Sequence, residues 1–249
     1  MELVTLAERP DLAEAAFAIP YPPGGEFMQG NEVAALVRRT RITRHWPEST
    51  VVLLDDGECV ARGVCVPFAA AAPEGERRRY PDGGWDQVAV WAAEDAMDGR
   101  EPDTLCALEV AVHPDRLRGG LSAHVLRGMR SAAAALGYPE LIVPVRPPRK
   151  ADEPWTPMAE YAARLREDGL PADPWLRVHV RLGATVVGVA PCSGTVRAPL
   201  ARWRAWTGLP FDTDGPVEVP GGLSPVLVSQ AHDIAVYVEP NVWVRHDTR

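Results

Sequence analysis

The chain has 249 residues with a formal net charge of −8, and 46% of its residues are apolar. This profile is typical of a globular protein of one large domain or one domain with additions, and the excess of acidic residues argues against general nucleic-acid binding. The four cysteines form no CxxC pair, the N-terminus lacks a signal-peptide pattern and no stretch is apolar enough to span a bilayer, so we expect no metal site, no membrane partner and a cytoplasmic location.

The first part of the chain predicts helices around a hairpin. Residues 11–17 predict a short helix capped by Asp11, and Asn31 is the expected N-cap of a second helix. The apolar runs on either side of DDGE at 55–58 predict a β-hairpin. A loop then leads to a predicted helix over 85–98, ended by a glycine.

The middle of the chain alternates strands and helices. Residues 104–112 predict a strand, 121–136 a helix with one apolar stripe, and 140–147 another strand. Pro144 inside that second strand cannot donate a ladder hydrogen bond, so we expect the strand to lack a partner on one side there. Asp173 is the expected cap of a later helix.

A strand, a short helix and several short strands, among them DIAVYV and NVWVR, complete the predicted elements. Their order predicts an α/β (α+β) fold with a mixed central sheet flanked by helices. We expect residues 1–195 to form the main domain. Residues 196–249 are expected to form a β-rich extension that packs on the same domain or on the second subunit of a homodimer.

The strand-to-helix junction VHPDRLRGGLS, at 112–122, is the most informative segment. The first amides of a helix and the helix dipole favour an anion, and Gly119 and Gly120 let a large anion come close to the backbone. Between residues 116 and 150 there are seven basic residues and one acidic residue. This pattern indicates a phosphate-bearing small molecule, and the alternative is an ordinary turn followed by a solvated helix face.

The longer segment VAVHPDRLRGGLSAHVL resembles the acetyl-CoA-binding segment of the GNAT superfamily of N-acetyltransferases. In that family a strand ending in V-x-P precedes Q/R-x-x-G-x-G/A at a helix start. With the central glycine on Gly120, the last small residue is Ser122 and the leading position is Leu117, so two of three positions depart from the pattern. The hairpin, ELIVPV and WLRVHVRLGATVVGV follow the family's order, and VEPNVWVRH resembles an extra segment of a long branch.

The resemblance implies that the strands at 104–112 and 140–145 splay apart, with the pantetheine arm of CoA between them. It implies acetyl-CoA, or another acyl-CoA, as co-substrate, with no metal. The residues that it implies for binding this co-substrate are Val110, Ala111, Val112, Leu117, Arg118, Gly119, Gly120, Leu121 and Ser122.

Glu109 and His179 are the candidate catalytic residues, because acyl transfer needs a base for the amine and a proton for the leaving thiolate. Strict alternation places Leu108, Val110 and Val112 on one face of the strand and Glu109 on the other. Burial there would raise the pKa of Glu109, and the alternatives are that it faces solvent or pairs with an arginine. The resemblance aligns His179 with the tyrosine that serves as general acid in many members, and the alternative is a hydrogen-bonded helix histidine.

The resemblance favours an acyl-CoA-dependent N-acyltransferase that acts on a small-molecule amine. The resemblance implies that the loop between the first two helices lines the acceptor side, so Tyr21, Glu26 and Phe27 are the candidate acceptor contacts. Aromatic residues at such positions can instead serve packing. Two alternatives stay open. One is a protein that binds acyl-CoA or pantetheine without transfer, and the other is a thioester hydrolase or decarboxylase on the same fold.

Overall fold

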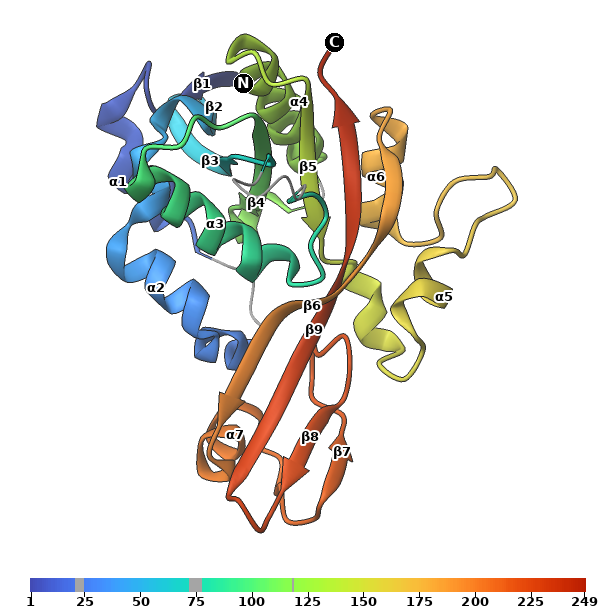
Figure 1. Ribbon diagram of the computed structural model, residues 1–249. Helices are drawn as coiled ribbons and strands as arrows, with labels where there is room; N and C mark the ends of the chain where they lie inside the picture. The colour runs from blue at the N-terminus through green and yellow to red at the C-terminus, as the bar shows by residue number, and fades with distance from the viewer. Residues whose placement is uncertain (21–24, 72–77, 118) are drawn as a thin grey trace.

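The computed structural model describes residues 1–20, 25–71, 78–117 and 119–249 (Figure 1). Its strands are β1 (Glu2–Thr5), β2 (Thr50–Asp55), β3 (Glu58–Phe68), β4 (Thr104–Val112), β5 (Glu140–Val145), β6 (Thr185–Ala198), β7 (Gly215–Val217), β8 (Val226–Ser229) and β9 (Ile234–Asp247). Its helices are α1 (Ala13–Ala18), α2 (Glu32–Thr40), α3 (Gly84–Asp98), α4 (Leu121–Ala135), α5 (Met158–Ala162), α6 (Pro174–Arg181) and α7 (Leu200–Thr207).

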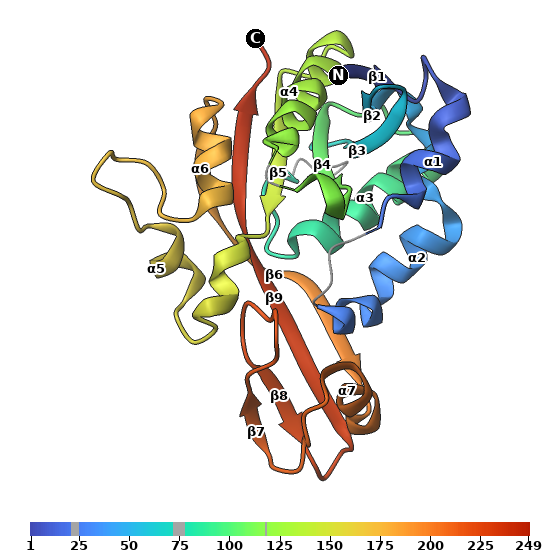
Figure 2. The same cartoon turned by 180° about the vertical axis from the view of Figure 1, so that it is seen from behind.

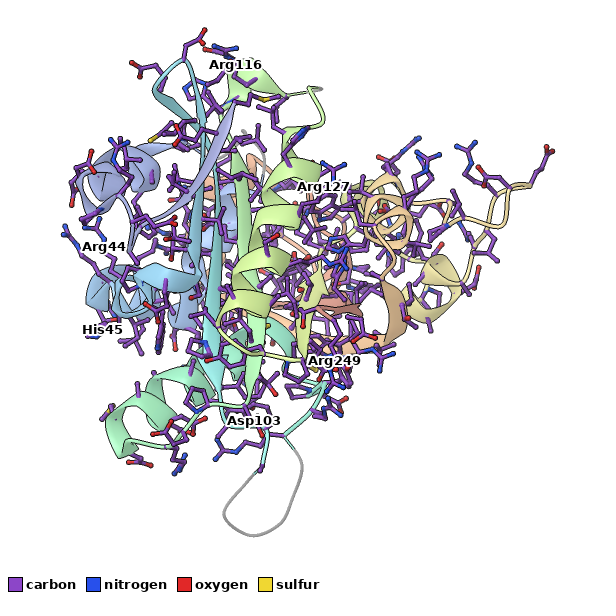
Figure 3. All side chains as sticks on the ribbon, turned by 90° about the horizontal axis from the view of Figure 1, so that it is seen from above. Arg44, His45, Asp103, Arg116, Arg127 and Arg249 are labelled. Atoms are coloured by element: carbon purple, nitrogen blue, oxygen red, sulfur yellow. The ribbon has the colours of Figure 1, made fainter. Side chains whose placement is uncertain are left out.

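The described strands form one mixed sheet in the order β1-β2-β3-β4-β5-β9-β8-β7, and β6 pairs with β9. Helices cover both faces of this sheet. α4 and α6 pack on one face through an apolar cluster that includes Leu126 and Leu176, while α3 packs on the other face through Val88. Figure 3 shows the two sides from above, with Arg127 on α4 and Arg44 and His45 across the sheet from it. The predicted α/β fold with a mixed central sheet is confirmed.

Local sequence signals correctly predicted several element boundaries. β2 and β3 form the predicted hairpin. Asn31 caps α2 by accepting a hydrogen bond from the amide of Ala34, and Asp173 caps α6 in the same way. The predicted cap at Asp11 is wrong, because Pro10 starts a 3-10 turn and α1 begins only at Ala13.

β4 and β5 run parallel but share only two paired positions, Leu105 with Leu141 and Cys106 with Ile142. Beyond these pairs the two strands diverge, as the sequence resemblance implied. Pro144 lies in the divergent part, where it faces Trp243 of β9 and, among the described residues, has no partner in β4. The prediction that the strand lacks a partner on one side at Pro144 is therefore confirmed, since a residue without an N–H tolerates an open edge.

The C-terminal segments are longer than predicted. DIAVYV and NVWVR belong to one strand, β9, which pairs with β5, β6 and β8. The outer parts of β6 and β9 project from the sheet together with β7, β8 and α7, and we call this unit the arm (Figures 1 and 2). The predicted division at residues 195 and 196 falls inside β6, and the two predicted parts share this strand and one continuous sheet. The division into domains stays a prediction.

Candidate functional site

A cavity of about 680 Å³ lies where β4 and β5 diverge, and we call it the wedge. It is lined by the second half of β4, the end of β5, the loop before α4 and the first part of α6. The side chains of Val110, Val112, Val143, Val145 and Trp175 make these walls largely apolar. A cavity of this volume is typical of sites that bind a small molecule or a cofactor arm.

The start of α4 forms one end of the wedge. Gly120 is its N-cap, with φ at 69°, and apart from its chain neighbours and the helix backbone no described atom lies within 4 Å of the place where a side chain would begin. Only glycine adopts this conformation readily, and its lack of a side chain leaves the backbone open to a ligand. The N-terminus of the 15-residue helix α4 favours an anion through its amides and its dipole.

The structure brings most of the predicted co-substrate residues to this cavity. Those that line it are Val110, Ala111, Val112, Leu117, Gly120, Leu121 and Ser122. Gly119 belongs to the same loop without lining the cavity, and Arg118 lies outside the described residues. Their roles in binding stay predictions.

A β-bulge sets the direction of the side chains around Glu109. Glu109 faces Val64 of β3, but the next residue of β3 faces Ala107, so Leu108 is an extra residue in β4. The prediction that side chains alternate strictly along this strand was therefore wrong. Leu108 packs in the cluster beside α3, whereas Val110 packs in the cluster beside α4.

Glu109 lines the wedge and forms an ion pair with Arg62 of β3. Arg62 is buried, with only 3% of its side chain exposed, and it also donates hydrogen bonds to the carbonyl oxygens of Ala16 (2.7 Å) and Ile19 (3.1 Å). Pairing with an arginine was one of the alternatives for Glu109, and the structure shows this pair. A carboxylate in such a pair keeps further lone pairs that can accept a proton from a ligand, so the role as base stays a prediction.

His179 also lines the wedge, as a fully buried side chain of α6. Its Nδ1 atom lies 2.8 Å from Nε2 of His246 in β9, and its ring packs against the ring of Trp175. Burial, with a smaller contribution from His246, lowers the pKa of His179 to about 3. His179 is therefore a neutral imidazole at physiological pH, and its catalytic role stays a prediction.

Two further carboxylates lie outside the lining of the wedge: Glu239 is buried and Asp86 is half-buried. Arg146, which lines the wedge, forms an ion pair of 3.0 Å with the buried Glu239 of β9. Burial, together with the charge of Glu239, raises the pKa of Asp86 in α3 to about 6, although Asn31 donates to the Asp86 carboxylate. Next to Asp86, the indole of Trp85 donates a hydrogen bond of 2.8 Å to the carbonyl oxygen of Leu108, a residue of the wedge.

We call Asp86, Glu109 and Glu239 the acidic group. Sequence reasoning identified only Glu109, and it missed Arg62 and His246 as well. The partners of these residues lie far away in the chain, and the only local signal was the arginine in the otherwise apolar strand of VARGVCV.

Glu26 and Phe27, two of the residues predicted to contact the acceptor, do not line the wedge. Phe27 is 2% exposed and packs against Trp203 and Tyr237 in the core of the arm. Glu26 is exposed, and Tyr21 lies outside the described residues. Phe27 therefore has the surroundings of a core residue, which was the alternative for aromatic residues in this loop.

Among the described residues, no helix has the length and apolar character needed to cross a membrane. No group of three or more His, Cys, Asp or Glu residues in the same ranges is arranged to hold a metal ion.

No family model matches the sequence. The chain is similar to the arginine N-acetyltransferase avaD of Aspergillus versicolor, with 31% identity over an alignment of 280 residues that covers 98% of this chain and 93% of that protein. Two solved structures, each 17% identical, share its fold. The loading GNATL domain of CurA from Lyngbya majuscula has a TM-score of 0.58 over 99% of this chain and 97% of that one. GphF, a GNAT-like decarboxylase in complex with isobutyryl-CoA, has a TM-score of 0.54 over 100% of both chains.

Proposed function

The chain belongs to the GNAT superfamily of N-acetyltransferases, and we propose that it transfers the acetyl group of acetyl-CoA to a nitrogen atom of a small cationic acceptor that resembles arginine. The wedge is the observation that carries this proposal. β4 and β5 separate after two paired positions, and the cavity between them reaches the open backbone at Gly120. This shape suits a long, thin pantetheine chain that is joined to a diphosphate.

The wedge supports CoA binding through its exposed strand edge as well as its apolar walls. Because β4 leaves β5 after Cys106, the edge of residues 107–112 has no strand partner on that side among the described residues. A pantetheine arm carries amide groups that can hydrogen-bond to such an edge, as an added strand would. The diphosphate would then accept hydrogen bonds from the first amides of α4.

The reaction forms one C–N bond and breaks one C–S bond. The acceptor nitrogen must first lose a proton, and the Glu109 carboxylate lines the cavity where it could accept that proton. The nitrogen lone pair then attacks the thioester carbonyl carbon, and the electron pair of the C–S bond leaves on sulfur. The sulfur takes up one proton, so the products are the N-acetylated acceptor and free CoA.

The acidic group supports a cationic acceptor. Glu109 lines the wedge and pairs with Arg62, and Glu239 pairs with Arg146, which also lines it. Asp86 interacts with the charge of Glu239 and has no ion pair with a basic residue among the described residues. Carboxylates bind the planar donors of a guanidinium in a bidentate manner. The name of the relative avaD, an arginine N-acetyltransferase, supports the same class of acceptor.

The test measures CoA thiol release from acetyl-CoA with arginine, lysine or a neutral amine of similar length as acceptor. The proposal predicts acceptor-dependent release with arginine, an arginine product heavier by one acetyl group, and slower turnover of the neutral amine. Failure of acetyl-CoA to protect the protein against thermal unfolding, together with no release for any acceptor, would contradict it. Release of CoA without any acceptor would favour the hydrolase alternative.

A further inference from the structure

Three buried polar atoms, one of them in His179 of the wedge, have no hydrogen-bond partner among the described residues. They are Nε2 of His179, Nδ1 of His246 and Nε of Arg130. Buried polar atoms without partners are rare in proteins, and several close together often mark a place where a ligand binds or a small shift completes a chain. These three come from α6, β9 and α4, which meet on one face of the sheet.

Arg130 forms hydrogen bonds to the backbone near both histidines. Its Nη1 donates to the carbonyl oxygen of Leu182, just after α6, and its Nη2 donates to that of Asp247, the residue after His246. The guanidinium charge also lowers the pKa of His246, after the larger effect of burial. The Nε–H group of Arg130 and Nδ1 of His246 are both buried, and neither has a hydrogen-bond partner among the described residues.

A guanidinium has only donors. A small shift that completes a hydrogen bond from Nε–H of Arg130 to His246 would therefore need a lone pair on Nδ1 of His246. A lone pair on Nδ1 of His246 places the proton of this neutral ring on Nε2, which then donates to Nδ1 of His179 at 2.8 Å. A neutral His179 that accepts at Nδ1 carries its own proton on Nε2.

We propose that Arg130 and His246 are positioning residues that keep the proton of His179 on Nε2, so that His179 presents an N–H donor to the thioester sulfur in the wedge. This inference rests on the proposed acetyl transfer. As the C–S bond breaks, its electron pair moves to sulfur, and the Nε2–H group stabilises that charge by a hydrogen bond. His179 keeps its proton, and the proton of the CoA thiol comes from the acceptor ammonium through solvent.

The first test compares two replacements of His246. The amide of His246→Gln can still donate to His179, whereas His246→Leu cannot. We expect His246→Leu to lower kcat by about 10- to 100-fold, because a hydrogen bond to a developing charge is lost, with KM for acetyl-CoA changed less than about 2-fold. His246→Gln should keep kcat within about 3-fold of the original, and His232→Leu, an exposed histidine of the arm, serves as the control. An unchanged kcat in a folded His246→Leu variant would overturn the inference.

The second test reads the tautomer of the unmodified protein by nitrogen NMR of its imidazole rings, with His179 assigned through the His179→Gln variant. The inference predicts a proton on Nε2 and none on Nδ1 of His179 from about pH 6 to about pH 8. A proton on Nδ1 overturns it. This measurement needs neither turnover nor a folded His246 variant. The NMR result therefore tests the tautomer of His179 even if acetyl transfer is not observed. The absence of acetyl transfer would count against the proposed function alone.

Discussion

At the scale of single residues, the chemistry of the wedge depends on partners that lie far away in the sequence. Glu109 and Arg62 are 47 residues apart, and His179 and His246 are 67 residues apart. The first pair holds a carboxylate at the cavity wall beside a buried guanidinium, and the second joins two buried imidazoles, of which His179 is kept neutral mainly by burial. Each pair therefore fixes the position of the residue that reaches the wedge.

Glu109→Gln tests the role of this carboxylate as base. We expect kcat/KM to fall by about 100-fold or more, because the amide cannot accept the proton of the acceptor. Glu140→Gln is the matched control, since Glu140 of the neighbouring strand β5 also pairs with an arginine, Arg79, but does not line the wedge. Steady-state rates and melting temperatures of both variants give the answer. Equal losses of activity in the two variants would show that the ion pair of Glu109 serves stability alone.

Asp86 predicts a pH dependence of acceptor binding. Its pKa is raised to about 6, mainly by burial, so the carboxylate becomes charged only as the pH passes that value. The folded protein keeps a proton that the unfolded chain has already lost, so this group lowers stability as the pH rises from about 4 to about 6. As the carboxylate of the folded protein ionises, from about pH 5 to about pH 7, the affinity for an unreactive guanidinium ligand should rise about tenfold.

Calorimetric titration of the Asp86→Asn variant should show no such rise, because an asparagine side chain does not titrate in this range. Asp82→Asn, at an exposed neighbouring position, should behave like the original protein. An unchanged pH profile in Asp86→Asn would exclude Asp86 from acceptor binding.

At the scale of elements, the start of α4 is the feature on which CoA binding depends. Gly120 and Gly137 stand at opposite ends of this helix, both have positive φ, and neither would have a clash at Cβ. Gly120→Glu should weaken acetyl-CoA binding by at least about 10-fold, because the new carboxylate repels the diphosphate from the helix start. Gly137→Glu carries the same backbone strain and should leave the affinity unchanged. Calorimetric titration with acetyl-CoA measures both affinities, and equal affinities for the two variants would contradict this account of the diphosphate site.

Element boundaries were predictable where the signal was local. The hairpin turn, the caps Asn31 and Asp173 and the glycine after α3 all act within a few residues, so the sequence alone revealed them. The β-bulge at Leu108 had no such signal, since it depends on how β4 meets β3. The length of β9 also escaped prediction: Pro240 lies between the two predicted short strands, and pairing with β6 continues on both sides of it.

At the scale of the whole molecule, β9 joins the arm to the wedge. It pairs with β5 at one end, with β8 at the other and with β6 along most of its length, and it supplies His246 and Glu239. The sequence predicted the fold and the position of the wedge, because the order of elements and the glycine junction can be recognised from continuous stretches of the sequence. It did not predict the roles of Glu239 and His246, which β9 brings beside Arg146 and His179.

This arrangement predicts that the arm and the wedge unfold together. Urea unfolding followed by far-UV circular dichroism and by tryptophan fluorescence should give one coincident transition. Trp243→Ala should lower the free energy of unfolding by about 3–5 kcal/mol, because Trp243 is buried beside α3 and bonds to Pro81, whereas Trp155→Ala at an exposed site should have little effect. Two separate transitions would show that the arm is an independent unit.

A crystal structure of the protein with CoA tests the central claim most directly. The account predicts the diphosphate against the first amides of α4 at Gly120, the pantetheine arm between β4 and β5, and the sulfur facing Glu109 and His179. CoA bound elsewhere, with the cavity between the two strands empty, would contradict it.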